Sequence, residues 1–347
     1  MTDIREPEPG IYFGMPAEEY HAIPALSQSL MKWLHVSPLD FWAVCPWLNP
    51  DYEEDSETEA KKNGTAFHDR IVEGRDAFYA RNAPEPDPDD YPEALHTQAD
   101  LKEACKARGL KVGGNKPELI ARLIEAEPLI QIWDVIVDEY VAAHEGKTLL
   151  SADQMRRIEI AAAMIERHPQ LSKAFAGGMP EVVIVWRDPE TGVMLKCRLD
   201  YLKVRSIVEL KSLSNPLNKP ADRAIYHNFG AYKHFCQAAH YLEGAAQIPT
   251  LLTAGRVHGD HDSEWLKKVA RSPKEFLFVY QFSGRAPVAK GRTFSSGLVF
   301  DCGKIRNHEA IRIYRENLDR FGSDPWVDLT PIEAIDDNEV PVWATME

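Results

Sequence analysis

Glu209 and Lys211 stand two residues apart in SIVELKS, a short and mostly apolar stretch that predicts a strand. Because side chains alternate across a sheet, this carboxylate and this ammonium project from the same face. Asp200 ends the preceding predicted strand and is expected to reach the same edge. Two oxygen ligands beside a lysine suit Mg²⁺ and a phosphate group that is to be cleaved. The triplet alone is weak evidence, because Glu–Lys pairs are common on exposed strands.

Four other polar residues could complete such a site. His68 follows GTAF in a predicted helix, and imidazole is a good ligand for Mn²⁺ and a usable one for Mg²⁺. Glu181 begins the first strand of a predicted hairpin. Gln237 and Tyr241 are four residues apart in a predicted long helix, so they share one helical face. Each residue alone is structural more often than functional, so the specific signal is their order along the chain.

The elements that must position these residues are predicted from hydrophobic periodicity and turn signals. Two amphipathic helices are predicted over residues 130–145 and 151–168, and a long helix over 222–247. The predicted strands cover residues 181–187, 193–202, 206–212, 276–282 and 293–301, and a last helix covers 304–320. This order predicts an α/β or α+β fold with a central mixed β-sheet flanked by helices.

Residues 84–93, PEPDPDDYPE, cannot continue a helix or a strand, because proline recurs throughout. The following segment, LKEACKARGLKVGGNKPELIARL, predicts two helices joined by a glycine-containing turn. The shared apolar face that it predicts consists of Leu101, Ala104, Cys105, Leu119, Leu123 and Ile124. The predicted organisation is therefore a main domain in two parts, 1–83 and 129–347, separated by a linker (84–97) and a helical insert (98–128).

The composition is that of an ordinary globular protein, with 44% hydrophobic and 27% charged residues. No stretch approaches the roughly 20 apolar residues that span a bilayer, and MTDIREPEPG is unlike a secretory signal, so a cytoplasmic protein without a membrane anchor is expected. Five cysteines without a CxxC pair argue against a disulfide framework, a zinc ribbon and an iron–sulfur cluster. The net charge of −14 argues against a surface coated with phosphate-binding lysines, but it allows a narrow channel with bound cations.

The order of GxxxH, a glutamate, a hairpin ending in aspartate, ExK on a strand and QxxxY on the next helix resembles the PD-(D/E)XK nuclease superfamily. Within it, the QxxxY helix resembles the RecB-like group. The segments GIYFGMPAEEYH, SQSLMKWLHVSPLDFW, GTAFHDRIVE, VIVWRDPETGVMLKCRLDYL, IVELKS and VPVWA are similar to the RecE-type exonuclease family. This likeness covers residues 10–75 and most of 129–347, and it implies a restriction-endonuclease-like core. Family members often have aspartate where Glu209 stands, and they do not obviously share residues 84–128 and 250–275.

The resemblance implies a role for each candidate residue. The metal ligands that it implies are His68, Asp200, Glu209 and, for a second metal, Glu181. Lys211 would serve the attacking water, while Gln237 and Tyr241 would orient the site. The implied cofactor is Mg²⁺, for which Mn²⁺ would substitute.

The implied reaction is 5′→3′ digestion of linear double-stranded DNA from its ends, which leaves 3′ single strands for recombination by a RecT-like annealing protein. A ring-shaped homo-oligomer is implied as well. Composition and spacing show none of these properties. Two alternatives stay open: a nicking or single-strand endonuclease on the same fold, and a non-catalytic DNA-binding adaptor. The complete set of metal ligands with Lys211 argues against the adaptor, because binding alone does not need them.

The insert resembles a SAP or helix-extension-helix module, in which a basic turn and the start of the second helix meet the DNA backbone. The matching candidates for phosphate contacts are Lys106, Arg108, Lys111 and Lys116. The start of the second helix adds a dipole that favours phosphate. The alternative is a small helical hairpin used only for packing, because Asp100, Glu103 and Glu118 nearly cancel its charge.

Overall fold

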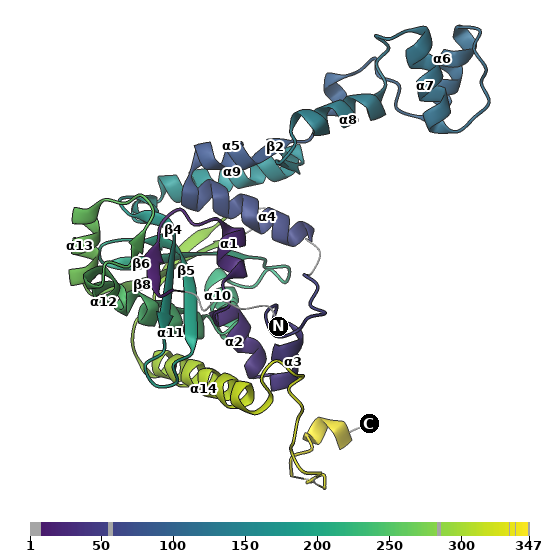
Figure 1. Ribbon diagram of the computed structural model, residues 1–347. Helices are drawn as coiled ribbons and strands as arrows, with labels where there is room; N and C mark the ends of the chain where they lie inside the picture. Colours follow the sequence, from purple (N-terminus) through teal and green to yellow (C-terminus); the bar gives the residue numbers. More distant parts are fainter. Residues whose placement is uncertain (1–7, 55–57, 283–285, 333, 337, 346–347) are drawn as a thin grey trace.

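A seven-stranded sheet, in the order β7-β1-β4-β5-β6-β8-β9, forms the centre of the computed structural model (Figure 1). The structure describes residues 8–54, 58–282, 286–332, 334–336 and 338–345. The strands are β1 (Gly10–Tyr12), β4 (Met179–Arg187), β5 (Met194–Leu202), β6 (Ser206–Leu213), β7 (Val257–His258), β8 (Glu275–Phe282) and β9 (Ala289–Thr293). The pairs β4–β5 and β5–β6 are antiparallel, whereas β6–β8 is parallel. The predicted mixed sheet is therefore confirmed.

Helices cover both faces of this sheet. The α-helices of the described chain are α1 (Ala17–Ala22), α2 (Gln28–Leu34), α3 (Pro38–Ala43), α4 (Glu59–His68), α5 (Arg75–Arg81), α6 (Gln98–Ala107), α7 (Lys116–Ala126), α8 (Trp133–Ala143), α9 (Ala152–Arg167), α10 (Ala221–Ala231), α11 (His234–Ala246), α12 (Ile248–Thr253), α13 (Ser263–Arg271) and α14 (Leu298–Phe321). A separate two-stranded sheet joins β2 (Asn82–Pro84) to β3 (Thr148–Leu150). Within the described residues, no helix has both the length and the apolar character that crossing a membrane requires.

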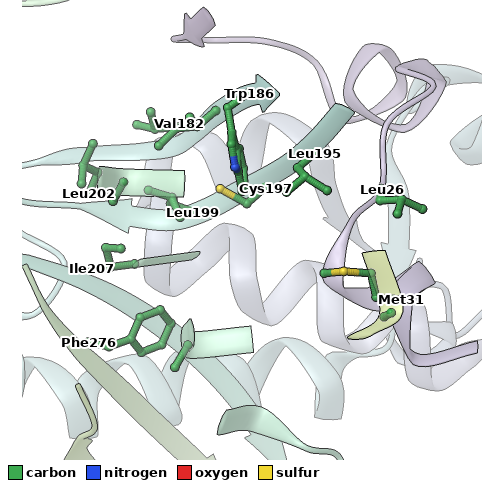
Figure 2. Close-up of a cluster of buried hydrophobic side chains, with 14 of the residues drawn as sticks. Leu26, Met31, Val182, Trp186, Leu195, Cys197, Leu199, Leu202, Ile207 and Phe276 are labelled. Carbon is green, nitrogen blue, oxygen red and sulfur yellow. The ribbon is translucent and has the colours of Figure 1, made fainter. Parts of the chain in front are cut away.

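The larger hydrophobic core lies between the sheet and the helices α2, α11 and α14. Figure 2 shows Trp186, Cys197 and Phe276 from the strands in this cluster, together with Met31 from α2. Helix α11 approaches the sheet closely at Gly244, where an added Cβ would lie 2.8 Å from the Cys197 sulfur. This close approach, near the C-terminal end of α11, brings the helix against β4 and β5.

A second core fills the opposite face of the sheet, beneath α4 and α9. Alternation along β6 separates the two cores, because Ile207 belongs to the first and Val208 and Leu210 belong to the second. Phe67 of α4 and Ile158 of α9 pack against this second set. The helix that bears His68 is thereby fixed on the face opposite to α11.

The single long helix predicted over 222–247 is wrong. The chain forms α10 and α11 instead, separated by Tyr232 and Lys233. Lys233 has φ 54° and ψ 42°, the left-handed conformation that no α-helix can contain. The break also allows His234 to turn inward, where its Nδ1 lies 2.9 Å from the Tyr280 hydroxyl. Helical periodicity could not show this break, because both halves keep an apolar face.

The strand predicted over 293–301 is also wrong. Strand β9 ends at Thr293, and α14 begins at Leu298 rather than at residue 304. Gly297 separates the two elements with φ 100°, a conformation that favours glycine. The apolar residues after this glycine therefore start a helix, although their β-branched and aromatic character favoured a strand.

The insert folds around a small core of its own. Helices α6 and α7 each begin with a capping box, at Thr97 with Asp100 and at Asn115 with Glu118. The buried residues of this core are Leu101, Ala104, Cys105, Leu119, Leu123 and Ile132. Ile124 was predicted on this face but is 36% exposed, because Ile132, which precedes α8, covers the core instead. Figure 1 shows α6 and α7 apart from the sheet, beyond α8.

Leu123→Ala should therefore destabilise the insert alone. Removing a fully buried leucine side chain costs about 2–5 kcal/mol, more than a core of this size can readily lose. Hydrogen exchange should accelerate in α6 and α7 and stay unchanged in the central sheet. The exposed Ile124→Ala serves as the matched control, and equal acceleration in the sheet would contradict an independent core.

Candidate active site

The candidate residues meet where β5 and β6 separate. These strands pair at Tyr201 with Val208 and at Leu202 with Ile207, and the same register places Asp200 opposite Glu209. At this point the Asp200 carboxylate accepts the Leu210 backbone N–H at 2.7 Å. The Asp200 side chain thus supplies a hydrogen bond in place of the backbone pairing that ends here. The carboxylates of Asp200 and Glu209 are left beside the gap between the strands.

His68, Glu181 and Asp200 form one cluster, contributed by α4, β4 and β5. The His68 Nε2 lies 3.1 Å from a Glu181 oxygen and 3.4 Å from an Asp200 oxygen. One possible ligand atom from each residue lies within 4.8 Å of the others. All three side chains are partly exposed. The structure therefore brings together three of the four predicted metal ligands from separate parts of the chain.

Glu181 adopts an unusual backbone conformation for a strand residue, with φ 55°. A non-glycine residue in this region costs of order 1–3 kcal/mol and persists only where its surroundings hold it. Glu181 is held by His68 and by an ion pair with Arg198. The backbone strain of Glu181 thus coincides with its two contacts inside the cluster.

Glu209 is contacted by α11, which lies on the other face of the sheet. It is only 3% exposed, and its Oε1 accepts hydrogen bonds from Lys211 at 2.8 Å and Gln237 at 2.6 Å. Its Oε2 is buried and has no partner among the described residues. Glu209 is therefore buried within the fold, where Gln237 of α11 covers it.

The charged residues of this site shift one another's pKa values. Burial lowers the pKa of His68, but Asp200 and Glu181 outweigh this effect and raise it well above its usual range. Burial and Asp200 raise the pKa of Glu209 to about 7. Burial also opposes the charged form of Lys211, yet Glu209 and Asp200 raise its pKa by more, so it stays protonated at neutral pH.

These donors fit a divalent cation. An imidazole nitrogen and carboxylate oxygens converge in the His68, Glu181 and Asp200 cluster, which is a suitable ligand set for Mg²⁺ or Mn²⁺. The unpartnered Oε2 of Glu209 offers a further buried oxygen, and such a group ordinarily has a partner. His68 would release its proton on coordination, because only neutral imidazole is a ligand.

Tyr241 lies one turn after Gln237 on α11, as its spacing predicted. Its ring packs beside Phe276, with ring centroids 6.1 Å apart. Burial and the nearby charge of Glu209 raise the pKa of Tyr241 well above its usual range, so the phenol stays neutral. Tyr241 therefore packs against β8 within electrostatic reach of Glu209.

Arg198 is a site residue that the sequence analysis did not identify. It forms an ion pair with Glu181 and stands two residues before Asp200 on β5. Alternation along the strand could have placed it on the same face as Asp200. No signal in the sequence indicated that His234 turns inward to its hydrogen bond with Tyr280. This residue follows the break between α10 and α11, which was not predicted.

The four basic candidates in the insert differ in whether their side chains form ion pairs. Arg108 is paired with Glu127 at 2.5 Å, and Lys116 is paired with Asp134 at 2.7 Å. Lys106 and Lys111 are exposed and form no ion pair with the described residues. Their ammonium groups are therefore the most accessible of the four.

One comparison with known protein families identifies the insert. The family model of the SAP domain matches residues 97–128, which confirms the predicted resemblance of this segment. No curated protein matches the chain. The chain is similar to a solved structure named "Putative exonuclease" from Eubacterium rectale, with 13% identity and a TM-score of 0.44. The match covers 89% of this chain and 85% of the other, and a similarity this weak establishes neither a common fold nor a common function.

The His68 ion pairs predict a particular pH dependence of stability in EDTA. Because the folded-state pKa of His68 is raised, its stabilisation is complete below the unfolded value of about 6.5 and is lost as pH rises through the folded value. His68→Gln should therefore lose most stability at low pH and progressively less as pH increases. Urea unfolding across a pH series measures this, with the exposed His227→Gln as control. A difference that stays constant with pH would contradict the ion pairs.

Proposed function

We propose that this protein is a metal-dependent nuclease that hydrolyses the phosphodiester bonds of DNA. The observation that supports this most strongly is the meeting of His68, Glu181 and Asp200 beside Lys211 and the buried Glu209, where two strands separate. A protein that only binds DNA does not need this combination of metal donors and a lysine. Mg²⁺ is the proposed cation, and Mn²⁺ should substitute for it.

Lys211 acts as a fixed positive charge in this proposal. Its raised pKa keeps it protonated, and its hydrogen bond to Glu209 holds the ammonium where β5 and β6 separate. A preorganised cation in such a place stabilises the negative charge that develops on a phosphate group during hydrolysis. Gln237 fixes the Glu209 carboxylate by its hydrogen bond, so α11 positions both the acid and the lysine.

A divalent cation held by His68, Glu181, Asp200 and Glu209 would supply a bound water of lowered pKa and neutralise phosphate charge. Arg198 keeps Glu181 in place for that purpose through their ion pair. The backbone N–H of Leu210 does the same for Asp200. The three carboxylate donors thus each have a second contact that restricts their orientation, as ligands in metal sites commonly do.

The finer proposal is an exonuclease that digests linear double-stranded DNA from its ends in the 5′→3′ direction. It follows from the resemblance of the chain to RecE-type enzymes. The same resemblance proposes a ring-shaped homo-oligomer and a RecT-like annealing protein that receives the 3′ single strand for recombination. The SAP domain supports DNA as the substrate, since such modules bind the DNA backbone.

Digestion of end-labelled DNA tests this proposal. With Mg²⁺, linear duplex should be degraded and its 5′ label should be released early as nucleotide, whereas covalently closed circles should survive. EDTA should stop the reaction, because the carboxylate cluster then lacks its cation. Rapid linearisation of closed circles would instead identify an endonuclease on the same fold.

Lys211→Ala should lose turnover while it keeps metal binding. The lysine acts on phosphate charge and not on the cation, so a loss of about 10²- to 10³-fold in kcat is expected. Mn²⁺ calorimetry and digestion at saturating metal separate the two effects, with the exposed Lys268→Ala as control. Collapsed metal affinity with normal turnover at saturating metal would show that the role given to Lys211 is wrong.

The SAP domain should add salt-sensitive affinity without contributing to the chemistry. Lys106→Gln combined with Lys111→Gln removes two exposed cations and leaves the insert core intact. Each phosphate contact that is lost lowers the slope of log affinity against log salt by about 0.9 on duplex DNA. Activity at low salt should persist, and digestion tracts should shorten as salt rises. An unchanged slope, also after deletion of 98–127, would make the insert a packing or protein-docking unit.

A further inference from the structure

A cavity lined by apolar and cationic side chains lies between α2, the junction of α10 and α11, and α14. Its volume is about 300 Å³. The side chains that give it polar character include Lys32, His35, Tyr232, Lys233, Cys236 and Arg306. None of the proposed metal ligands is among its lining residues in the described chain, so this cavity is a feature separate from the metal cluster.

The charge of the cavity is opposite to that of the whole chain. The chain has a net charge of −14, whereas the lining contains Lys32, Lys233 and Arg306 and, among the described residues, no carboxylate. These three cations form no ion pair with a described residue, while Arg70 and Arg81 each contact two carboxylates. In so acidic a chain, three unpaired cations around one cavity indicate a site for an anion.

Arg306 has a donor that is out of contact with water. Its Nε is buried and has no hydrogen-bond partner among the described residues. The guanidinium lies against the thiol of Cys236, which is a weak acceptor, and the Arg306 carbonyl lies 3.0 Å from His35 Nε2. A buried unsatisfied donor of this kind is costly unless a ligand supplies the acceptor.

Lys233 occupies its place at the cavity at a conformational cost. Its left-handed backbone, with φ 54°, is disfavoured for a residue with a Cβ, and glycine or asparagine would fit better. Strained non-glycine residues concentrate at functional sites. A lysine at this position therefore indicates that its charge has a use.

The cavity is close to the proposed chemistry. Lys233 immediately precedes α11, and Gln237, which holds Glu209, lies in the first turn of that helix. Lys32 lies within electrostatic reach of Lys211, since partial desolvation and the Lys211 charge lower its pKa. A DNA strand at the metal site would therefore place a neighbouring phosphate near the cavity.

We propose that this cavity binds a phosphate group of the DNA strand, adjacent to the phosphodiester that the active site hydrolyses. Lys32 and Lys233 supply point charges, and the Arg306 guanidinium supplies planar donors suited to phosphate oxygens. This assignment rests on the proposed nuclease function and adds to it the residues that hold the substrate strand in register. Lys32, Lys233 and Arg306 are thus substrate-positioning residues.

Binding of inorganic phosphate tests the cavity without any DNA. Phosphate is titrated into the metal-free full-length protein in EDTA, and thermal unfolding is followed. Phosphate should raise Tm in the wild type, in Lys32→Arg and in the exposed control Lys268→Gln. Lys32→Gln and Lys233→Asn should lose at least half of this rise. Lys233→Asn should unfold no earlier than the wild type without phosphate, because asparagine tolerates the left-handed backbone.

Steady-state digestion tests the link to the substrate. Lys32→Gln should raise KM for linear duplex roughly tenfold and leave kcat near the wild-type value, since one charge-assisted contact is lost outside the chemistry. Duplexes with 5′-phosphate and 5′-hydroxyl ends are compared. An increase confined to phosphorylated ends assigns the cavity to a terminal phosphate, and an increase on both assigns it to an internal one.

The two proposals fail in different ways. An unchanged phosphate-induced Tm shift in both Lys32→Gln and Lys233→Asn overturns the cavity assignment, whatever the nuclease assays show. A fall in kcat with an unchanged KM in Lys32→Gln overturns it as well. A wild-type protein that digests no DNA, yet loses phosphate binding in both variants, refutes the nuclease function and retains the anion site.

Discussion

The crowding of three carboxylates on the central strands, where β5 and β6 separate, is the constraint on which the rest of this structure depends. Glu181, Asp200 and Glu209 lie where water is partly or wholly excluded, so their mutual repulsion must be offset. His68 and Lys211 offset it in the metal-free protein by ion pairs and hydrogen bonds. The separation of β5 and β6 makes room for these groups.

Two helices reach this region from opposite faces, and each is irregular where it does so. α4 ends at His68, and a π-helical turn from Asp69 to Glu73 follows directly, a feature that often marks functional sites. α11 starts afresh at His234 after the left-handed Lys233, which sets the rotation that presents Gln237 to Glu209. The close contact at Gly244 then fixes the distance of α11 from the sheet. Local irregularity and tight packing together orient the site.

The SAP domain and the main domain have separate hydrophobic cores. The insert buries its own apolar residues around Leu101 and Leu123, and it meets the remainder of the chain through Ile132 and the start of α8. Its accessible cations are few, and the cavity cations Lys32 and Arg306 belong to the main domain. An acidic protein can thus engage DNA through small basic regions, while its overall charge limits binding elsewhere on the surface.

The sequence by itself determined the mixed sheet, the helical insert and the pairing of Glu209 with Lys211 on one face, because strand alternation and helix capping are local rules. It could not determine that Glu209 is buried, since burial depends on how closely α11 packs against the sheet. It also missed the break at Lys233, where tertiary packing overrides a continuous helical pattern. Only the tertiary structure decided that His68 and Glu181 lie within reach of one cation, because contacts between distant residues follow from the whole fold.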